Sequence, residues 1–399
     1  MINFTRLVAL AALAAGAVQL PAAEPATIEQ RLDRLEAALQ RIEAKLGDTV
    51  SADELAPALK EYSDLTHQLV WDGKSPLTVA KAGGKEQKIS VGGYLQLNGE
   101  LGDAPDARFN GIFNRFYVRR ARLTVKGTFA ENIDFNFQTE LGNNAIANNA
   151  ASRAQLTDAF VTWNKYDEAN LNFGQFKIPF GYEQLQSDTK IATIERSLPN
   201  DQLTLGRQIG LDLAGTAADK RINYAVGVFN GNGANNGGND NDQFLSVARV
   251  GVTPWRAAAG KLTVAVDGYQ TREGATAATR VNRTAWGADT QFTSGPFELD
   301  AEYLSMHLDR LIGTDTTADG WSVQGSWFFP GKIFQAVTRY ETYDANTALS
   351  ANTSATWVFG LNYFLKGDDL KLSLDYLDGD PAGPLKNQGR FLGRMQVIF

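Results

Sequence analysis

The C-terminal segment of the chain alternates strictly between two kinds of side chain. Phe391, Met395 and Phe399 fall on one side of the alternation, and Arg390 and Arg394 fall on the other. Successive side chains of a β-strand point to opposite faces, so this segment predicts a strand with one apolar and one polar face. Similar alternation recurs back to about residue 88. Most of the chain is therefore constrained to be a sheet of many strands.

The pattern predicts sixteen strands, separated by connections that are alternately short and long. Pro330-Gly331 is a short connection, and residues 230–241, rich in Asn, Asp and Gly, form a long one. Short turns at one rim and long loops at the other are typical of barrels that cross an outer membrane, and a sheet in lipid must close. We therefore expect an all-β fold, a 16-stranded antiparallel transmembrane β-barrel. The strands are expected near residues 88–101, 112–128, 131–142, 155–165, 169–178, 206–216, 220–230, 242–254, 261–272, 283–293, 296–306, 319–328, 332–344, 354–365, 368–377 and 389–399.

The alternative fold is a soluble β-sandwich, or several of them. Predicted strands of about ten residues, a terminal Phe399 and aromatic residues near strand ends favour the barrel, because aromatic rings prefer the interface between lipid and water. Examples of such rings are Trp163, Trp255, Trp286 and Trp321. The expected location of the protein is therefore the bacterial outer membrane, with lipid as the partner of the apolar face.

The N-terminal segment, residues 1–23, is typical of a secretory signal peptide. Arg6 supplies the positive start, residues 7–18 are apolar, and Pro21-Ala22-Ala23 ends the segment with small side chains. The alternative is a membrane anchor, for which the apolar stretch is short and rich in alanine.

Residues 24–47 carry a heptad pattern. Its apolar positions are four and three residues apart, at Ile28, Leu32, Leu35, Leu39, Ile42 and Leu46. This spacing favours a coiled-coil helix that pairs with copies of itself in the periplasm, and the alternative is an amphipathic helix packed on its own barrel. Residues 48–87, with two prolines and a Gly-Gly pair, are expected to be a linker before the barrel of residues 88–399.

Composition argues against several classes of function. The net charge of −7 disfavours a nucleic-acid partner. There is no cysteine, and the two histidines, His67 and His307, lie far apart in the sequence, so neither a metal site nor a local catalytic motif is indicated. We expect no catalytic residue, no metal, no cofactor and no enzymatic activity.

The chemically informative cluster is a row of basic residues in the second predicted strand. Arg120, Arg122 and Lys126 share one face, and the opposite face is apolar, so the basic face should line the lumen. Such a row can attract anions through the pore. Arg119 has the wrong parity and is expected at a bulge, at the rim or at a subunit contact.

The basic row has a second interpretation, in which the arginines brace the wall. They would then pair with lumenal carboxylates such as Asp134, Glu140 or Asp158. The longest connection, from Pro179 to about Leu205, is the segment we expect to fold inward and narrow the lumen, because a sixteen-stranded barrel is otherwise wide.

Three segments resemble one known family. They are the run from Arg119 to Gly127, the run Phe173-Gly-Gln-Phe-Lys-Ile-Pro-Phe-Gly181, and Glu195-Arg196-Ser197. Together with the signal peptide, the helix and the terminal Phe, they make the whole chain similar to the phosphate-selective porin O and P family. The resemblance implies a homotrimeric outer-membrane porin that draws phosphate, polyphosphate or other small anions through a basic-lined pore. The residues that it suggests are Arg120, Arg122, Lys126, Lys190, Arg196 and Ser197, with Asp158 as a partner on the wall.

The chain departs from that family in the charge of the long connection. Between residues 178 and 209 three basic residues face four acidic ones, and Asp188 interrupts the polar stretch that precedes Lys190. The alternative function is a general or cation-leaning porin. A structural protein that tethers the outer membrane through its helix is a third interpretation.

Overall fold

The computed structural model describes residues 37, 40, 77–78, 88–130, 132–143, 145–147 and 152–399. The chain divides into two units, residues 1–75 and 76–399, and only the second is described further. The predicted signal peptide, coiled-coil helix and linker lie outside the described residues, except for residues 37, 40 and 77–78. These three assignments stay predictions.

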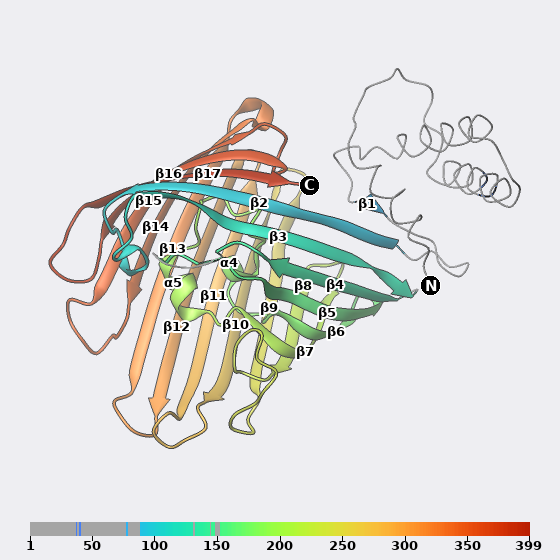
Figure 1. The fold of residues 1–399 in the computed structure, drawn as a ribbon, viewed down its shortest axis with the longest axis horizontal. Coiled ribbons are helices and arrows are strands. Elements are labelled where there is room, and N and C mark those ends of the chain that lie inside the picture. The colour runs from blue at the N-terminus through green and yellow to red at the C-terminus, as the bar shows by residue number, and fades with distance from the viewer. Residues whose placement is uncertain are drawn as a thin grey trace, which may run out of the picture. The chain divides into compact units, whose positions relative to one another are not determined.

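Sixteen long strands form the wall in the described part of the chain. Each is antiparallel to the next, and β17 pairs with β2, so the sheet closes on itself. The predicted 16-stranded antiparallel barrel is confirmed (Figure 1). The strands are β2 (Lys88–Gly102), β3 (Arg115–Ala130), β4 (Ile133–Glu140), β5 (Gln155–Tyr166), β6 (Ala169–Lys177), β7 (Arg207–Ala217), β8 (Ile222–Phe229), β9 (Leu245–Ala257), β10 (Gly260–Glu273), β11 (Val281–Ser294), β12 (Phe297–Arg310), β13 (Thr316–Phe328), β14 (Phe334–Asp344), β15 (Thr353–Phe364), β16 (Leu370–Asp380) and β17 (Gln388–Ile398).

The seam between β17 and β2 joins the two ends of the sheet. Pairing stops where Ile398 lies opposite Tyr94, and the main chain of Phe399 exchanges hydrogen bonds with Gly93. Beyond that point β2 continues, and a two-residue strand, β1 (Leu77–Thr78), pairs with it. β1 therefore occupies part of the β2 edge that β17 leaves unpaired.

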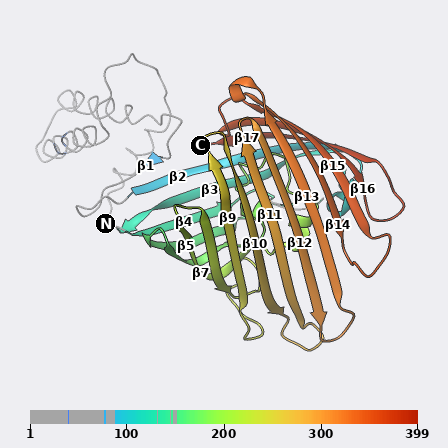
Figure 2. The same ribbon diagram turned by 180° about the vertical axis from the view of Figure 1, so that it is seen from behind.

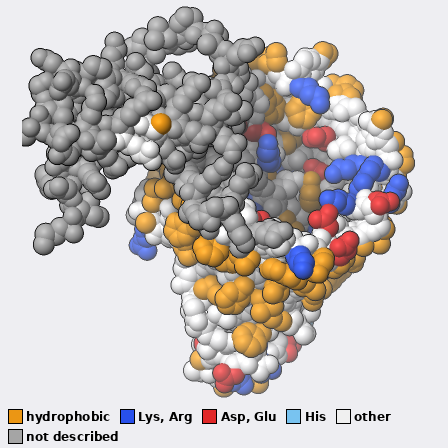
Figure 3. Space-filling view, turned by 90° about the vertical axis from the view of Figure 1, so that its right-hand side faces the viewer, with side chains coloured by type: hydrophobic (Ala, Val, Ile, Leu, Met, Phe, Trp, Pro, Cys, Tyr) orange, Lys and Arg blue, Asp and Glu red, His pale blue; other side chains and the backbone are white. Residues whose placement is uncertain are grey.

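The two faces of the wall differ as the alternation predicts. On β2, Leu95 and Leu97 are exposed on the outside, and Gln96 and Asn98 are buried on the inside. Figure 3 shows apolar side chains covering the outer wall and charged side chains of both signs gathered inside the hollow mouth. None of the helices in the described residues has the length and apolar character needed to cross a membrane.

The connections alternate in length, as expected. Residues 167–168 suffice between β5 and β6, and residues 178–206 link β6 to β7. We call residues 178–206 the inward connection; it contains the short helices α4 (Tyr182–Leu185) and α5 (Leu198–Leu203). Both helices lie within the ring of strands in Figure 1, and Figure 2 shows the wall of strands from behind.

Apolar packing inside the barrel holds the inward connection on one side. Its residues Ile178, Phe180 and Leu203 are buried together with inward-facing side chains of β8 to β13, among them Phe229 and Tyr269. The ring of Phe180 meets that of Tyr269 edge to face, with centroids 4.7 Å apart. These contacts bury apolar surface and so fix where the connection enters the lumen.

A charge placed on the outer wall should destabilise the barrel. We expect Leu123→Arg to lower the free energy of unfolding by about 2–4 kcal/mol, because position 123 faces outward near the middle of β3. The neighbouring Thr124 faces the lumen and contacts Gln138. Thr124→Arg is therefore the matched control and should cost much less. Urea titration of refolding in lipid vesicles measures both, and equal losses would contradict the assignment of faces.

Candidate functional site in the lumen

The inward connection lies inside the barrel and contacts strands far apart on the wall. The Gly181 amide donates to Asp267 of β10 at 3.1 Å, and the Leu198 amide donates to Glu341 of β14 at 3.0 Å. The Ile194 amide donates to Asp375 of β16 at 2.6 Å. Wall carboxylates thus satisfy backbone N–H groups that would otherwise be buried without partners.

The start of the inward connection is held by the end of β6. The Lys177 ammonium group donates to the carbonyl oxygens of Gln184 at 2.6 Å and Gln186 at 2.8 Å. Gln175 donates to the carbonyl of Leu156 at 2.8 Å and so joins β6 to β5. Lys177 therefore stabilises the start of the inward connection, and Gln175 stabilises the wall between β5 and β6.

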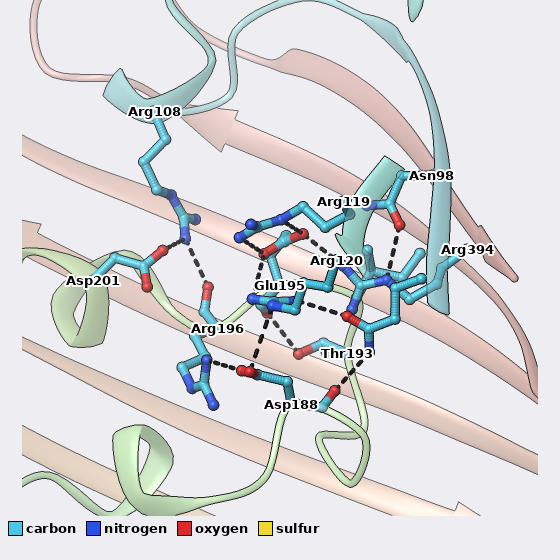
Figure 4. Close-up of polar contacts among 12 residues, drawn as sticks. Asn98, Arg108, Arg119, Arg120, Asp188, Thr193, Glu195, Arg196, Asp201 and Arg394 are labelled. Atoms are coloured by element: carbon cyan, nitrogen blue, oxygen red, sulfur yellow. Dashed lines mark hydrogen bonds and ion pairs between the residues drawn. The ribbon is translucent and has the colours of Figure 1, made fainter. Parts of the chain in front are cut away.

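Asp188 gathers three arginines around one carboxylate. It lies 2.6 Å from the Arg122 guanidinium, 2.5 Å from that of Arg196 and 3.5 Å from that of Arg120. The Tyr94 hydroxyl donates to it at 3.2 Å. Asp188 and Arg196 belong to the inward connection, and the other three residues belong to β2 and β3, so this carboxylate ties the connection to the wall (Figure 4).

Glu195 makes a second tie a few residues later. It accepts two hydrogen bonds from Arg119, at 2.8 and 2.9 Å. It also forms an ion pair with Arg394 of β17, at 2.7 Å. Paired bonds of this kind are among the stronger polar contacts in proteins. Figure 4 shows Arg119, Arg120 and Arg394 converging on Glu195 from the wall.

The structure decides the position of Arg119. The register between β2 and β3 shifts by one residue, so that Gln96 lies opposite Arg120 and Leu97 lies opposite Val118. Arg119 is the extra residue of a β-bulge, which turns it inward beside Arg120. Of the three predicted places for Arg119, the bulge is the one observed.

We define the arginine cluster as the group formed around these two ties. Five guanidinium groups face three carboxylates, since Glu140 also pairs with Arg122 at 2.7 Å. The cluster therefore carries two excess positive charges. Within the described residues, Arg119 Nη1 and Arg120 Nε find no hydrogen-bond acceptor. The members of the cluster are Arg119, Arg120, Arg122, Arg196, Arg394, Glu140, Asp188 and Glu195.

The two acids of the inward connection keep their charge. Burial alone would raise the pKa of the Asp188 carboxyl, but Arg120, Arg196 and Arg122 outweigh it and hold this pKa well below its usual range. Burial likewise opposes ionisation of Glu195, and Arg119 and Arg394 hold its pKa below the ordinary value. The ties therefore persist at pH values where free carboxylates, with a pKa of about 4, become protonated.

The remaining predicted site residues are spread over the lumen. Asp158 makes a paired contact with Arg207 of β7, at 2.8 and 3.0 Å. Lys190 is exposed and lies 2.6 Å from Asp368. Lys126 lies exposed near the other end of the basic row.

Ser197, predicted to contact anions, makes contacts within the inward connection itself. Its hydroxyl donates to Glu183 at 2.6 Å and accepts from the Asn200 amide, which caps α5. Of the carboxylates expected to brace the arginines, Glu140 pairs with Arg122, whereas Asp134 bonds Thr128 and Asn164.

Several residues that position the site were not singled out from the sequence. Arg394 falls on the predicted inner face of the last strand, so its parity was the available signal. Arg339 of β14 donates to Thr193 at 2.6 Å and to the Glu195 carbonyl at 3.0 Å. Arg108 precedes β3 in a connection, where no periodicity indicates a role.

The opposite wall carries acidic side chains. Glu302 of β12 accepts from the Tyr182 amide at 2.5 Å, and Asp300 accepts from the Tyr182 hydroxyl at 3.2 Å. A small cavity between this wall and the inward connection is also lined by Glu183, Gln324 and Arg339. The lumen thus has basic groups on β3 and β17 and acidic groups on β12. Among the described residues, no cluster of three or more His, Asp or Glu side chains is arranged to hold a metal.

The family model for phosphate-selective porin O and P matches residues 91–390. Porin O of Pseudomonas aeruginosa is 23% identical over 395 residues, which cover 84% of this chain and 85% of that protein. The anion-selective porin from Comamonas acidovorans has a TM-score of 0.58 at 14% identity and covers 79% of this chain and all of its own. A trimer form of OmpT from Vibrio cholerae has a TM-score of 0.56 at 12% identity, with coverage of 79% and 100%. At these identities the two solved structures show a shared fold.

Proposed function

The chain belongs to the phosphate-selective porin O and P family, and from that premise we propose that it lets small anions, with phosphate and polyphosphate as candidates, diffuse passively across the outer membrane. It is an outer-membrane porin, and a channel rather than an enzyme. We propose that the inward connection forms the narrowest part of the pore and that the arginine cluster sets the preference for anions.

The excess positive charge of the arginine cluster is the observation that carries this proposal. Five guanidinium groups against three carboxylates leave two positive charges in a region that water screens poorly. Arg120 is the least neutralised member, because its ion pairs with Asp188 and Glu195 are 3.5 and 3.9 Å long. Such a field raises the local concentration of anions without direct contact.

We assign the other predicted residues to the path on either side of the cluster. Lys126 and Lys190 are exposed, so they can meet a hydrated anion directly. Ser197 supports the connection through Glu183, and the pairing of Asp158 with Arg207 supports the wall. Weak and exchangeable contacts suit a channel, since a solute that binds tightly does not leave.

The second candidate is a weakly selective porin in which the same arginines brace the wall. The observation that favours it is burial: the side chains of Arg119, Arg120 and Arg394 are at most 6% exposed and each is ion-paired. The acidic groups Asp300 and Glu302 on the facing wall would then offset the basic field.

We also propose that three copies assemble. The family resemblance and the trimer form recorded for OmpT support this assembly, and the heptad pattern of residues 24–47 offers a second contact between copies. In this arrangement the signal peptide of residues 1–23 is removed and the helix lies in the periplasm.

Ion preference in a planar lipid bilayer tests the function. In a gradient of potassium chloride the reversal potential should report chloride over potassium, and added phosphate should block the chloride current. Arg120→Ala should weaken the preference, whereas the exposed Arg153→Ala, which removes the same charge, should leave it nearly unchanged. Cation preference in the parent channel would contradict the first candidate, and equal behaviour of the two variants would favour the second.

A further inference from the structure

A second connection also folds into the barrel. Residues 103–114, between β2 and β3, contain the turn η2 (Ala107–Phe109), and Asp106, Phe109 and Ile112 within it are almost fully buried. Phe109 and Ile112 form an apolar cluster with Ile194 of the inward connection and with wall residues of β15 to β17. Residues 103–114 therefore cover the inner wall and touch the inward connection.

Close backbone approach fixes this second connection on β16. Gly379 falls on the inner face of β16, in step with Leu377. A Cβ atom at Gly379 would lie 2.1 Å from the carbonyl oxygen of Pro105, a distance that no side chain tolerates. Glycine at 379 is thus the condition for residues 103–114 to lie against the wall.

Arg108 joins the two connections to each other. Its guanidinium group makes a paired contact with Asp106, at 3.0 and 2.8 Å, and so is held in one orientation. From there it reaches Asp201 of the inward connection at 2.7 Å and the carbonyl of Arg196 at 2.7 Å. Glu341 of β14 lies 3.5 Å away. Figure 4 shows the side chain of Arg108 extending from residues 103–114 toward Asp201 and Arg196.

We propose that residues 103–114 are a second element of the pore constriction and that Arg108 is the positioning residue that sets its size limit. The inference rests on the proposed channel function, but not on its preference for anions. With Arg108 in place, the two connections and β14 form one body, so the opening that they leave free in the lumen has a fixed width. Without it, Asp201 and the Arg196 carbonyl lose a buried donor, and the two connections can separate.

Passage of neutral solutes tests this proposal separately from ion preference. We compare Arg108→Met with Arg153→Met, which removes the same charge from an exposed position. In liposome swelling, Arg108→Met should admit larger neutral oligosaccharides than the parent channel, and its single-channel conductance should rise about twofold or more. Arg153→Met should leave both unchanged. Arg108→Lys retains one ion pair but not the fork, so it should fall between the parent and Arg108→Met.

The double variant Arg108→Met with Asp201→Asn separates positioning from a loss of stability. If Arg108 acts through Asp201, this double variant should enlarge the size limit no more than Arg108→Met alone, since the two changes break one contact. Gly379→Ala keeps every charge and displaces residues 103–114 from β16, so it should enlarge the limit too and serves if Arg108→Met does not fold. A folded Arg108→Met channel with the parent size limit and conductance would overturn the proposal. A parent channel without ion preference would remove the anion function and leave this inference standing, and a parent without current would remove both.

Discussion

The Asp188→Asn channel is expected to prefer anions more strongly than the parent channel. Asparagine keeps the shape of the side chain but removes the charge that Arg120, Arg122 and Arg196 share. The excess on the arginine cluster then grows by one positive charge. One unit charge at this range contributes about 1 kcal/mol, which corresponds to roughly a fivefold higher ratio of anion to cation permeability.

Reversal potentials in a salt gradient measure this change. Asp240→Asn is the matched control, because Asp240 is an exposed acid of the long connection between β8 and β9. The same substitution at Asp188 should also lower the free energy of unfolding by about 3 kcal/mol, since it leaves buried arginines without their partner. An unchanged reversal potential together with unchanged stability would show that Asp188 neither neutralises the cluster nor ties the connection to the wall.

Gly174→Ala is expected to prevent most of the protein molecules from folding into the barrel. Gly174 has a φ of 135° in the middle of β6, and a Cβ atom there would lie 2.1 Å from the Ala159 carbonyl oxygen of β5. The unusual φ alone costs about 1–3 kcal/mol for a residue with a side chain. The contact with backbone cannot be relieved by a rotamer change, so β5 and β6 must separate, and an open edge in lipid is costly.

The yield of folded barrel measures the effect of Gly174→Ala. Folded and unfolded forms can be separated by electrophoresis without heating. Gly237→Ala is the matched control, because a Cβ atom at that position meets nothing within 4 Å. Comparable yields of the two variants would mean that β6 accepts a side chain where the structure has none.

The barrel could be predicted closely because its information is local. Each strand carries its own alternation, and each pair of strands carries its own turn, so the boundaries of β2 differ from the predicted ones by a single residue. The bulge at Arg119 was harder, because one inserted residue leaves a pattern that a rim position or a subunit contact explains equally well.

The partners of the basic row could not be predicted with the same success. The expected carboxylates were those of neighbouring strands, and one of them, Glu140, does pair with Arg122. Asp188 and Glu195 come instead from a connection far along the chain. Periodicity places a side chain on a face, but it does not say which loop will reach that face. In the sequence, Asp188 and Glu195 were visible only as part of the excess of acidic residues in the long connection.

The same limit explains why Arg108 escaped notice. A buried arginine in a connection has no alternation around it, and its nearest acid, Asp106, is ordinary for a turn. Its partners Asp201 and Glu341 lie far away in the sequence. Only the folded chain brings them together.

The seam between β17 and β2 has a consequence for how the protein is made. Residues 388–398 supply the strand that meets β2, and the main chain of Phe399 completes the pairing at Gly93. Until that strand is available, β2 and β16 each present a free border, so the preceding strands cannot become a sealed wall however well they pair. Closure must therefore wait for the last strand, and a chain that ends before residue 388 would leave two unpaired borders in lipid.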